Sequence, residues 1–317
     1  MKRILVTGAS GQIGAELVPA LREKYGADNV VAGSHNRPLT DEIAEGGPST
    51  KVNITSRDSM DKAIKEFGID SLYHLASVLS AAAEVNRPMS HAVNVTGLIN
   101  VLEVASENSL DRVIIPSSIG AFGPGTPPDN TPNDTIQRPT TLYGIAKVFG
   151  ELMGNYYFEK LGLDVRGVRL PGIISWKVEP TSGTTDYAVD AFYGAIRQGS
   201  YNCYLKRGTY LPMMYMPDAV SALIQVAEAD VTGLRHHADF NVNSMSFAPE
   251  HLEEAIKLRV PGFKMEYEID PVRQAIADSW PNSLDDAVAR KEWGWQPTFG
   301  LSEVVDDMLK NLTRKLA

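Results

Sequence analysis

A glycine-rich turn near the start of the chain constrains the fold more than any other feature of the sequence. It lies between a short β-rich segment, residues 3–7, and a segment with helical spacing, residues 13–25. Glycines at this spacing permit a tight turn, a close approach of the backbone to a pyrophosphate, and close packing of helix on strand. The alternative is a turn with a purely structural role, but the strand–turn–helix context favours dinucleotide binding. The predicted cofactor contacts in the turn are Gly8, Gly11, Gln12, Ile13 and Gly14.

Strand-like and helix-like segments alternate through the first half of the chain. Predicted strands cover residues 3–7, 29–32, 71–76, 112–117 and 164–170, and predicted helices cover residues 13–25, 60–67, 93–105 and 142–161. Such alternation implies a parallel, doubly wound sheet whose strands are buried on both faces. We therefore predict a Rossmann-type α/β fold in which residues 1–172 form the dinucleotide-binding domain.

The regular alternation of strand-like and helix-like segments ends after residue 171, where prolines and glycines interrupt it. Helices are expected at residues 187–197, 218–228, 249–258 and 301–312, and strands at 210–215, 240–242 and 264–269. These shorter elements indicate that residues 173–317 form a smaller C-terminal lobe, mainly substrate-binding and partly interleaved with the sheet.

The end of the second predicted strand carries no acidic residue. An acid at this place would bond the adenosine ribose 2′-hydroxyl and favour NAD. Ser34, Asn36 and Arg37 stand there instead, and these side chains suit a 2′-phosphate. The alternative is a solvated loop with an incidental arginine. We predict cofactor contacts at Ser34 and Arg37, while the residues alone leave NAD and NADP both open.

A tyrosine and a lysine, Tyr143 and Lys147, lie four residues apart near the start of a predicted helix and therefore share a face. An ammonium beside a phenol stabilises the phenolate, so Tyr143 is predicted to act as general acid/base. Ser118 comes earlier, at the carboxyl end of a predicted strand, where α/β sheets bind ligands. Ser117 offers the same hydroxyl one position earlier, and chemistry alone does not choose between them.

The glycine turn, the serine and the Tyr-x-x-x-Lys pair, in this order, resemble the extended short-chain dehydrogenase/reductase superfamily, which includes UDP-galactose 4-epimerase. The resemblance runs along nearly the whole chain. It implies a nicotinamide dinucleotide, catalytic roles for Ser118, Tyr143 and Lys147, and a homodimer formed through the long helices. It also implies cofactor contacts by Leu75, Ala76, Ser77, Asn94, Tyr143, Lys147, Leu170, Pro171 and Ile173. We further expect Asn53 and Ile54 to contact the cofactor.

Four segments, residues 114–124, 183–188, 210–219 and 278–281, are similar to the short-chain L-threonine 3-dehydrogenases. Members of that subfamily oxidise the 3-hydroxyl of L-threonine to 2-amino-3-oxobutanoate with NAD. The resemblance implies the same reaction here, with NAD as cofactor. The missing acid at Ser34 departs from the pattern of NAD-linked members and leaves NADP open.

A small zwitterionic substrate needs hydrogen-bond donors for its carboxylate and an apolar wall for its methyl group. The predicted substrate contacts are Ser80, Ser118, Tyr143, Gly183, Thr184, Thr185 and Trp280. Three of them have an ordinary alternative: Thr184 could cap the next helix, Ser80 could be a loop residue, and Trp280 could pack in a core. Met213, Met214 and Met216 are predicted to be packing residues.

Two other functions stay open. One is a nucleotide-sugar epimerase or dehydratase of the same fold, for which Arg197, Lys206 and Arg207 are available to a diphosphate. The other is a non-catalytic dinucleotide-sensing protein, which has no need of a base.

Composition narrows the remaining classes. The net charge is −9, without a basic cluster, so no nucleic-acid or membrane partner is expected. The single cysteine, Cys203, is expected to be a packing thiol. The six histidines show no metal-binding spacing, and the adjacent His236 and His237 are predicted to lie in a solvated turn. The N-terminus lacks a signal-peptide core, so a cytoplasmic location is expected.

Overall fold

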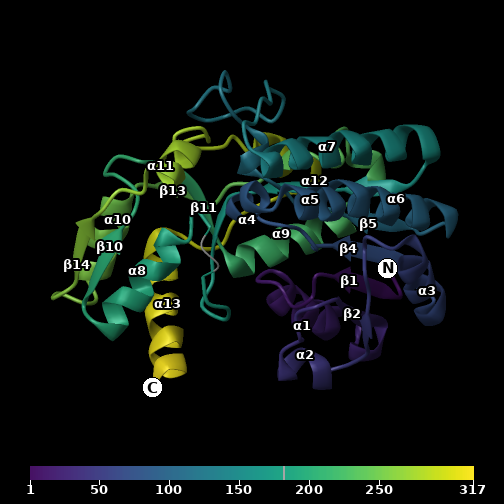
Figure 1. The fold of residues 1–317 in the computed structure, drawn as a ribbon, viewed down its shortest axis with the longest axis horizontal. Coiled ribbons are helices and arrows are strands. Elements are labelled where there is room, and N and C mark those ends of the chain that lie inside the picture. Colours follow the sequence, from purple (N-terminus) through teal and green to yellow (C-terminus); the bar gives the residue numbers. More distant parts are fainter. Residues whose placement is uncertain (181–182) are drawn as a thin grey trace.

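A six-stranded parallel sheet lies at the centre of the larger lobe in the computed structural model, which describes residues 1–180 and 183–317 (Figure 1). Its strands are β1 (Ile4–Thr7), β2 (Val30–Ser34), β3 (Ser49–Lys51), β4 (Ser71–His74), β5 (Arg112–Ile114) and β7 (Asp164–Arg166). They are all parallel and follow the order β3-β2-β1-β4-β5-β7. The order reverses direction between β1 and β4, and sheets of this kind bind ligands at that point. The predicted Rossmann-type α/β fold is confirmed.

Helices cover both faces of this sheet. Helices α1 (Gly14–Tyr25) and α9 (Met216–Glu228) pack on one face, and α3 (Arg57–Phe67), α6 (Leu98–Glu107) and α7 (Leu142–Tyr156) pack on the other. Within β1, Ile4 and Val6 belong to the first core and Leu5 to the second. Because both faces are apolar, the strands read in the sequence as continuous apolar runs.

Two strands that the sequence predicts as continuous are broken in the structure. After β5 the chain resumes as β6 (Ser117–Ser118), and after β7 it resumes as β8 (Val168–Leu170). Pro116 has no amide hydrogen to give to a ladder, and a Cβ on Gly167 would lie 2.4 Å from the carbonyl oxygen of Ile115. Strand β12 (Phe240–Asn241) pairs with β8, which also pairs with β6, in a three-stranded sheet to which both halves of the chain contribute.

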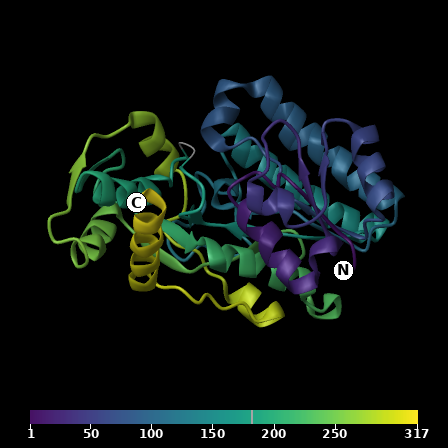
Figure 2. The same ribbon diagram turned by 90° about the horizontal axis from the view of Figure 1, so that it is seen from below.

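The smaller lobe is built around a separate core (Figure 2). It contains α8 (Tyr187–Arg197), α10 (Pro249–Lys257), α13 (Leu301–Leu316) and the parallel pair β10 (Ser200–Cys203) and β14 (Lys264–Tyr267). A three-stranded sheet joins β13 (Met245–Phe247), β11 (Leu211–Tyr215) and β9 (Gly172–Ile174). Cys203, Met213, Met214 and Met216 are fully buried, which confirms them as packing residues.

The remaining described elements are short. They are η1 (Ala27–Asn29), α2 (Asp41–Glu45), α4 (Ser80–Val85), α5 (Arg87–Ser90), η2 (His91–Gly97), η3 (Ile119–Ala121), η4 (Tyr157–Leu161), η5 (Val231–Gly233), α11 (Pro271–Ala277) and α12 (Ala287–Trp293). The helix predicted at 93–105 begins earlier, since α5, η2 and α6 follow one another directly, and the helix predicted at 142–161 ends in the π-turn η4. Among the described helices, none combines the length and apolar character needed to cross a membrane.

Candidate active site

One cavity of about 850 Å³ collects nearly every residue that the sequence predicts for the site. The predicted residues that line it are Gly8, Gly11, Gln12, Ile13, Gly14, Ser34, Arg37, Asn53, Ile54, Leu75, Ala76, Ser77, Ser80, Ser118, Tyr143, Lys147, Leu170, Pro171, Ile173, Gly183, Thr184, Thr185 and Trp280. They come from both halves of the chain and meet where the strands of the main sheet end at their carboxyl termini.

The glycine turn forms one wall of the cavity and fits a pyrophosphate. Gly8 has a φ of 73°, and a Cβ added to it would lie 2.7 Å from the amide nitrogen of Ala76. A Cβ on Gly14 would lie 2.5 Å from the carbonyl oxygen of Gly8. The turn is thus pressed against the end of β4, and α1 is pressed against the turn. Backbone amides at the start of α1 can therefore reach an anion without an intervening side chain.

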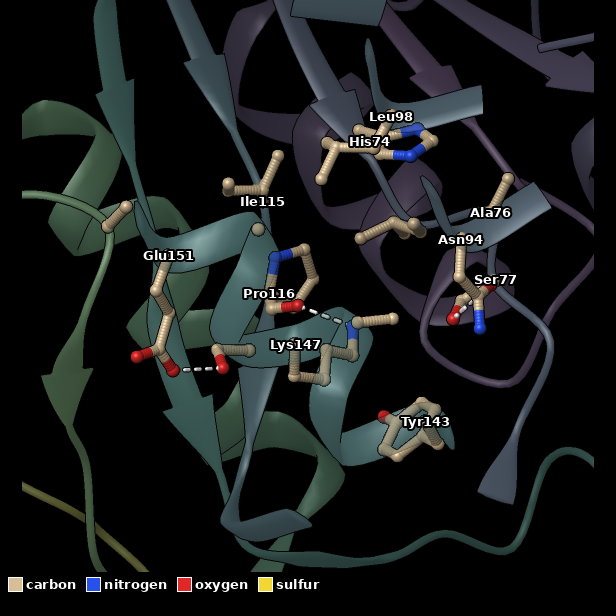
Figure 3. Close-up of a pocket in the computed structure, with 15 residues that line it drawn as sticks. His74, Ala76, Ser77, Asn94, Leu98, Ile115, Pro116, Tyr143, Lys147 and Glu151 are labelled. Atoms are coloured by element: carbon tan, nitrogen blue, oxygen red, sulfur yellow. Dashed lines mark hydrogen bonds between the residues drawn. The ribbon is translucent and has the colours of Figure 1, made fainter. Parts of the chain in front are cut away.

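Tyr143 and Lys147 stand on the first turns of α7, which opens with a cap. The Thr141 hydroxyl accepts a hydrogen bond from the amide of Gly144 at 3.1 Å. The Lys147 Nζ lies 5.2 Å from the centre of the Tyr143 ring and donates to the carbonyl oxygen of Pro116 at 2.7 Å (Figure 3). The backbone between β5 and β6 thereby holds the ammonium beside the phenol.

The two serines of β6 have different surroundings. Ser117 is buried and its hydroxyl donates to the Glu151 carboxylate. Ser118 is half-buried, and its hydroxyl accepts from the amide of Gly120 at 3.1 Å. A Cβ on Gly120 would lie 3.2 Å from the Tyr143 ring and 3.5 Å from the Ser118 hydroxyl. The side chain of Ser118 therefore approaches Tyr143, whereas that of Ser117 is engaged in a network below the site.

That network centres on Glu151, two helical turns after Tyr143 on α7. The Arg169 guanidinium donates to Glu151 at 3.0 and 2.9 Å, and Gln137 Nε2 donates to it at 2.7 Å. Burial opposes the charge of Arg169, but the Glu151 carboxylate raises the arginine pKa above its ordinary value. The Glu151–Arg169 pair thereby anchors Ser117 to α7, and Figure 3 shows Glu151 beside the site.

A second cavity of about 50 Å³ lies behind Lys147 and is lined in part by His74 and Asn94 (Figure 3). Burial, aided by the Lys147 ammonium, lowers the pKa of His74 to about 3, and its Nδ1 lies 2.9 Å from the Thr7 hydroxyl. Asn94 is the predicted cofactor residue that does not line the large cavity. Its amide brackets Val78, accepting from the backbone amide at 2.7 Å and donating to the carbonyl at 2.9 Å.

The predicted substrate residues lie together at another part of the large cavity. Asp186 occupies the N-cap of α8, so the alternative that Thr184 caps this helix is wrong. Thr184 is buried against the cavity, and the Tyr204 hydroxyl donates to the Gly183 carbonyl at 2.9 Å. The alternative of a loop position for Ser80 is also wrong, because Ser80 opens α4. Trp280 both lines the cavity and packs against two cores.

Sequence reasoning missed several lining residues. Ser117 and Asn36 are alternatives that the sequence offers, and the others are Thr7, Ser10, His35, Val52, Thr55, Val78, Leu79, Ala81, Ala82, Met89, Ala92, Val93, Pro116 and Asp186. Ser10 had a usable signal, since it lies within the glycine turn. Val78, Leu79, Ala81 and Ala82 had none, because α4 is too short to show a helical period.

The adjacent histidines are not in a solvated turn, so that prediction is wrong. The His236 ring nitrogens lie 2.8 Å from a Glu292 carboxylate oxygen and 3.2 Å from one of Asp134. His237 is buried, with its ring stacked 3.5 Å from that of Phe158. In residues 1–180 and 183–317 we find no group of three or more His, Cys, Asp or Glu placed to hold a metal ion.

Comparison with known proteins places the chain in a family. Residues 4–242 match the model of the NAD dependent epimerase/dehydratase family. An uncharacterized epimerase/dehydratase of Staphylococcus aureus is 47% identical over 99% of this chain and 98% of its own length. The structure of an L-threonine dehydrogenase from Clostridium difficile is 46% identical, with a TM-score of 0.96, over 99% of this chain and 98% of that one. A GalE-like L-threonine dehydrogenase from Cupriavidus necator, in its holo form, is 46% identical, with a TM-score of 0.95, over 98% and 99%.

Proposed function

The chain belongs to the NAD-dependent epimerase/dehydratase family, and we propose that it oxidises the 3-hydroxyl of L-threonine to 2-amino-3-oxobutanoate. The observation that carries the proposal is the single cavity in which the glycine turn, the Tyr143–Lys147 pair and the loop before α8 meet. Two solved structures that are 46% identical to this chain over nearly its whole length are described as L-threonine dehydrogenases.

In the proposed reaction Tyr143, as phenolate, removes the proton from the substrate 3-hydroxyl. The Lys147 ammonium beside its ring stabilises that phenolate. The Ser118 hydroxyl donates a hydrogen bond to the same oxygen as it becomes a carbonyl. When bound, the nicotinamide supplies the acceptor for the hydride that leaves C3 of the substrate. The protein contributes alignment and stabilisation of charge.

The remaining lining residues divide between cofactor and substrate. We assign the pyrophosphate to the glycine turn and the rest of the dinucleotide to the predicted cofactor residues of the cavity. Asn94 acts indirectly, by fixing the segment 77–78. Ser80, Thr184 and Thr185 offer hydroxyls to the substrate carboxylate, and Trp280 offers an apolar wall. The domain division at residue 172, a homodimer and a cytoplasmic location stay predictions.

A nucleotide-sugar epimerase or dehydratase is the main alternative within the family. Its substrate needs cationic or amide partners for a diphosphate. The three cations that the sequence offered are engaged elsewhere: Arg197 with Glu179 at 3.3 Å, Lys206 with Asp278 at 3.1 Å, and Arg207 with Glu253 at 3.2 Å. None of them lines the large cavity, which favours the smaller substrate.

The test is the absorbance of reduced nicotinamide during incubation with L-threonine and either dinucleotide. We expect Tyr143→Phe to lower kcat by about 100-fold or more, with cofactor binding retained. Tyr156→Phe is the matched control, because Tyr156 lies on the same helix but is exposed and away from the cavity. If the wild-type protein reduces neither dinucleotide with threonine, the proposed reaction is wrong, and UDP-sugars are the substrates to assay next.

A further inference from the structure

The carboxyl end of β2 carries a set of side chains that the threonine reaction does not explain. Ser34, His35, Asn36 and Arg37 follow one another there and all line the large cavity. The only carboxylate among the lining residues is that of Asp186, at the start of α8 in the other lobe (Figure 1). A site that selects NAD places an acid at the end of this strand to bond the ribose 2′-hydroxyl. Here the end of the strand offers a hydroxyl, an amide and a guanidinium instead.

We propose that this end of the cavity binds the 2′-phosphate of NADP, and that the protein prefers NADP to NAD. Arg37 is the charge partner, and Ser34 and Asn36 donate hydrogen bonds. A phosphate monoester carries a charge of about −1.5 to −2 at neutral pH. A guanidinium matches its oxygens with two parallel hydrogen bonds. The inference rests on the proposed function only in taking the cavity as a dinucleotide site.

The backbone holds this segment in place before any ligand arrives. The amide of Val52 donates to the carbonyl of Ser34 at 2.7 Å, and Ser34 is paired with Lys51 of β3. Arg37 precedes Pro38, which confines its backbone to extended conformations. Leu39 then packs against the main core. The segment is therefore anchored on both sides of Arg37, which limits the entropy lost when the side chain meets a phosphate.

The charge of Arg37 is available for a ligand. Within residues 1–180 and 183–317 no carboxylate forms an ion pair with it, whereas the exposed Arg197 and Arg290 both have acidic partners. The chain as a whole carries a net charge of −9 and repels a phosphate. Such a chain needs a local cation without an acidic partner in order to hold the 2′-phosphate in addition to the pyrophosphate.

Binding of adenosine fragments tests the proposal without any turnover. We compare the Kd of adenosine 2′,5′-bisphosphate with that of 5′-AMP by isothermal titration calorimetry. The bisphosphate should bind about tenfold tighter or better, because charge-assisted hydrogen bonds contribute at this level. Arg37→Ala should bring the two Kd values within about twofold of each other, with 5′-AMP little affected. Arg314→Ala, an exposed arginine on α13, is the matched control and should keep the full difference.

A second variant reverses the preference. Ser34→Asp supplies the missing acid, so it should weaken the bisphosphate and bring the Kd of NAD⁺ below that of NADP⁺. In the wild-type protein the advantage of the bisphosphate should shrink as salt approaches 1 M, where the Debye length falls to about 3 Å.

Equal Kd values for the two fragments, or tighter binding of NAD⁺ than of NADP⁺ by the wild-type protein, would overturn the proposal and make Arg37 a solvated arginine. The outcome is separate from that of the threonine assay. A preference for the 2′-phosphate without threonine oxidation leaves the subsite standing and rejects the reaction. Threonine oxidation with NAD⁺ but not with NADP⁺ supports the reaction and rejects the 2′-phosphate subsite.

Discussion

At the scale of single residues, the ion pair between Glu151 and Arg169 makes the strongest prediction about stability. Arg169 is 3% exposed, and Glu151 supplies its only carboxylate hydrogen-bond partner among the described residues. Glu151→Ala leaves a buried guanidinium without a counter-charge, so it should lower the free energy of unfolding by about 3–5 kcal/mol. Urea denaturation measures this loss directly.

A surface pair provides the matched control. Glu107 is also paired with an arginine, Arg57, but both side chains are about half exposed. Because solvent screens such pairs, Glu107→Ala should leave the unfolding curve almost unchanged. Equal losses in the two variants would show that burial of the charge is not the cause.

His74 makes a prediction about acid stability. Burial and the Lys147 ammonium lower its pKa from 6.5 to about 3, so the folded protein binds fewer protons than the unfolded chain between these values. The contribution of neutral His74 is complete above pH 6.5 and is lost as the pH falls toward 3, by about 1.4 kcal/mol per pH unit. His74→Gln removes the titration. The stability difference between wild type and variant should therefore narrow between pH 6.5 and pH 4, and parallel curves would contradict the assignment.

Residue placements were predictable where one local pattern carries them, as with Tyr143 and Lys147, which lie beside each other at the cavity. They were not predictable where the partner lies far away in sequence. Ser117 is distinguished from Ser118 only by Glu151, and the setting of His236 depends on Glu292. For Asn94 the family resemblance implies a cofactor contact, and the hydrogen bonds by which it brackets Val78 are visible only in three dimensions.

At the scale of elements, the fit of α7 against η3 determines where Tyr143 lies. A Cβ on Gly144 would lie 2.1 Å from the carbonyl oxygen of Gly120 and 2.6 Å from the Pro139 side chain. Gly144→Ala must therefore push the start of α7 away from η3 and displace Tyr143 from Ser118. Misplacement on the order of 1 Å costs about 100-fold in rate, so kcat should fall by about that factor.

The control for this variant is Gly262→Ala, since a Cβ at Gly262 meets nothing within 4 Å. It should keep both the wild-type kcat and the melting temperature. A Gly144→Ala protein with full activity would show that the helix start adapts, and the tight contact would then have no catalytic meaning.

The positions of the main strands and long helices were predictable, because strands buried on both faces give continuous apolar runs and the spacing of the long helices repeats over ten or more residues. Their interruptions were not. Pro116 and Gly167 break two strands through contacts between neighbouring strands. Helices such as α2, α4 and α12, of five to seven residues, are too short to show a period.

At the scale of the whole molecule, strand–helix alternation predicts the main sheet but not how the two halves of the chain combine. Strand β12 pairs with β8 from residues 240–241, and the cavity takes Trp280 from the far end of the chain. Such placements depend on packing between residues far apart in the chain, so no local sequence pattern predicts them. Fragments cut near residue 172 would therefore lose a strand of this three-stranded sheet as well as part of the cavity wall.

The predicted homodimer is also a property of the whole molecule, and α7 offers the surface for it. Ile145, Leu152 and Tyr156 lie on one stripe of this helix and are 52%, 62% and 52% exposed. The opposite side of the same helix carries Tyr143 and Lys147 toward the cavity. A second copy packed on the stripe would cover apolar surface and brace the helix that holds the proposed base.

We expect Leu152→Lys to shift the protein from dimer to monomer in analytical ultracentrifugation at micromolar concentrations. A charge in the middle of an apolar interface loses its hydration without gaining a partner. Leu258→Lys is the control, since Leu258 is 78% exposed but lies just after α10 in the other lobe. If α7 is the interface, only Leu152→Lys dissociates the protein, and the resulting monomer loses activity because α7 is no longer braced. A dimer that survives Leu152→Lys must use another face. A wild-type protein that is monomeric and active would contradict the predicted dimer and show that α7 holds Tyr143 in place without a partner.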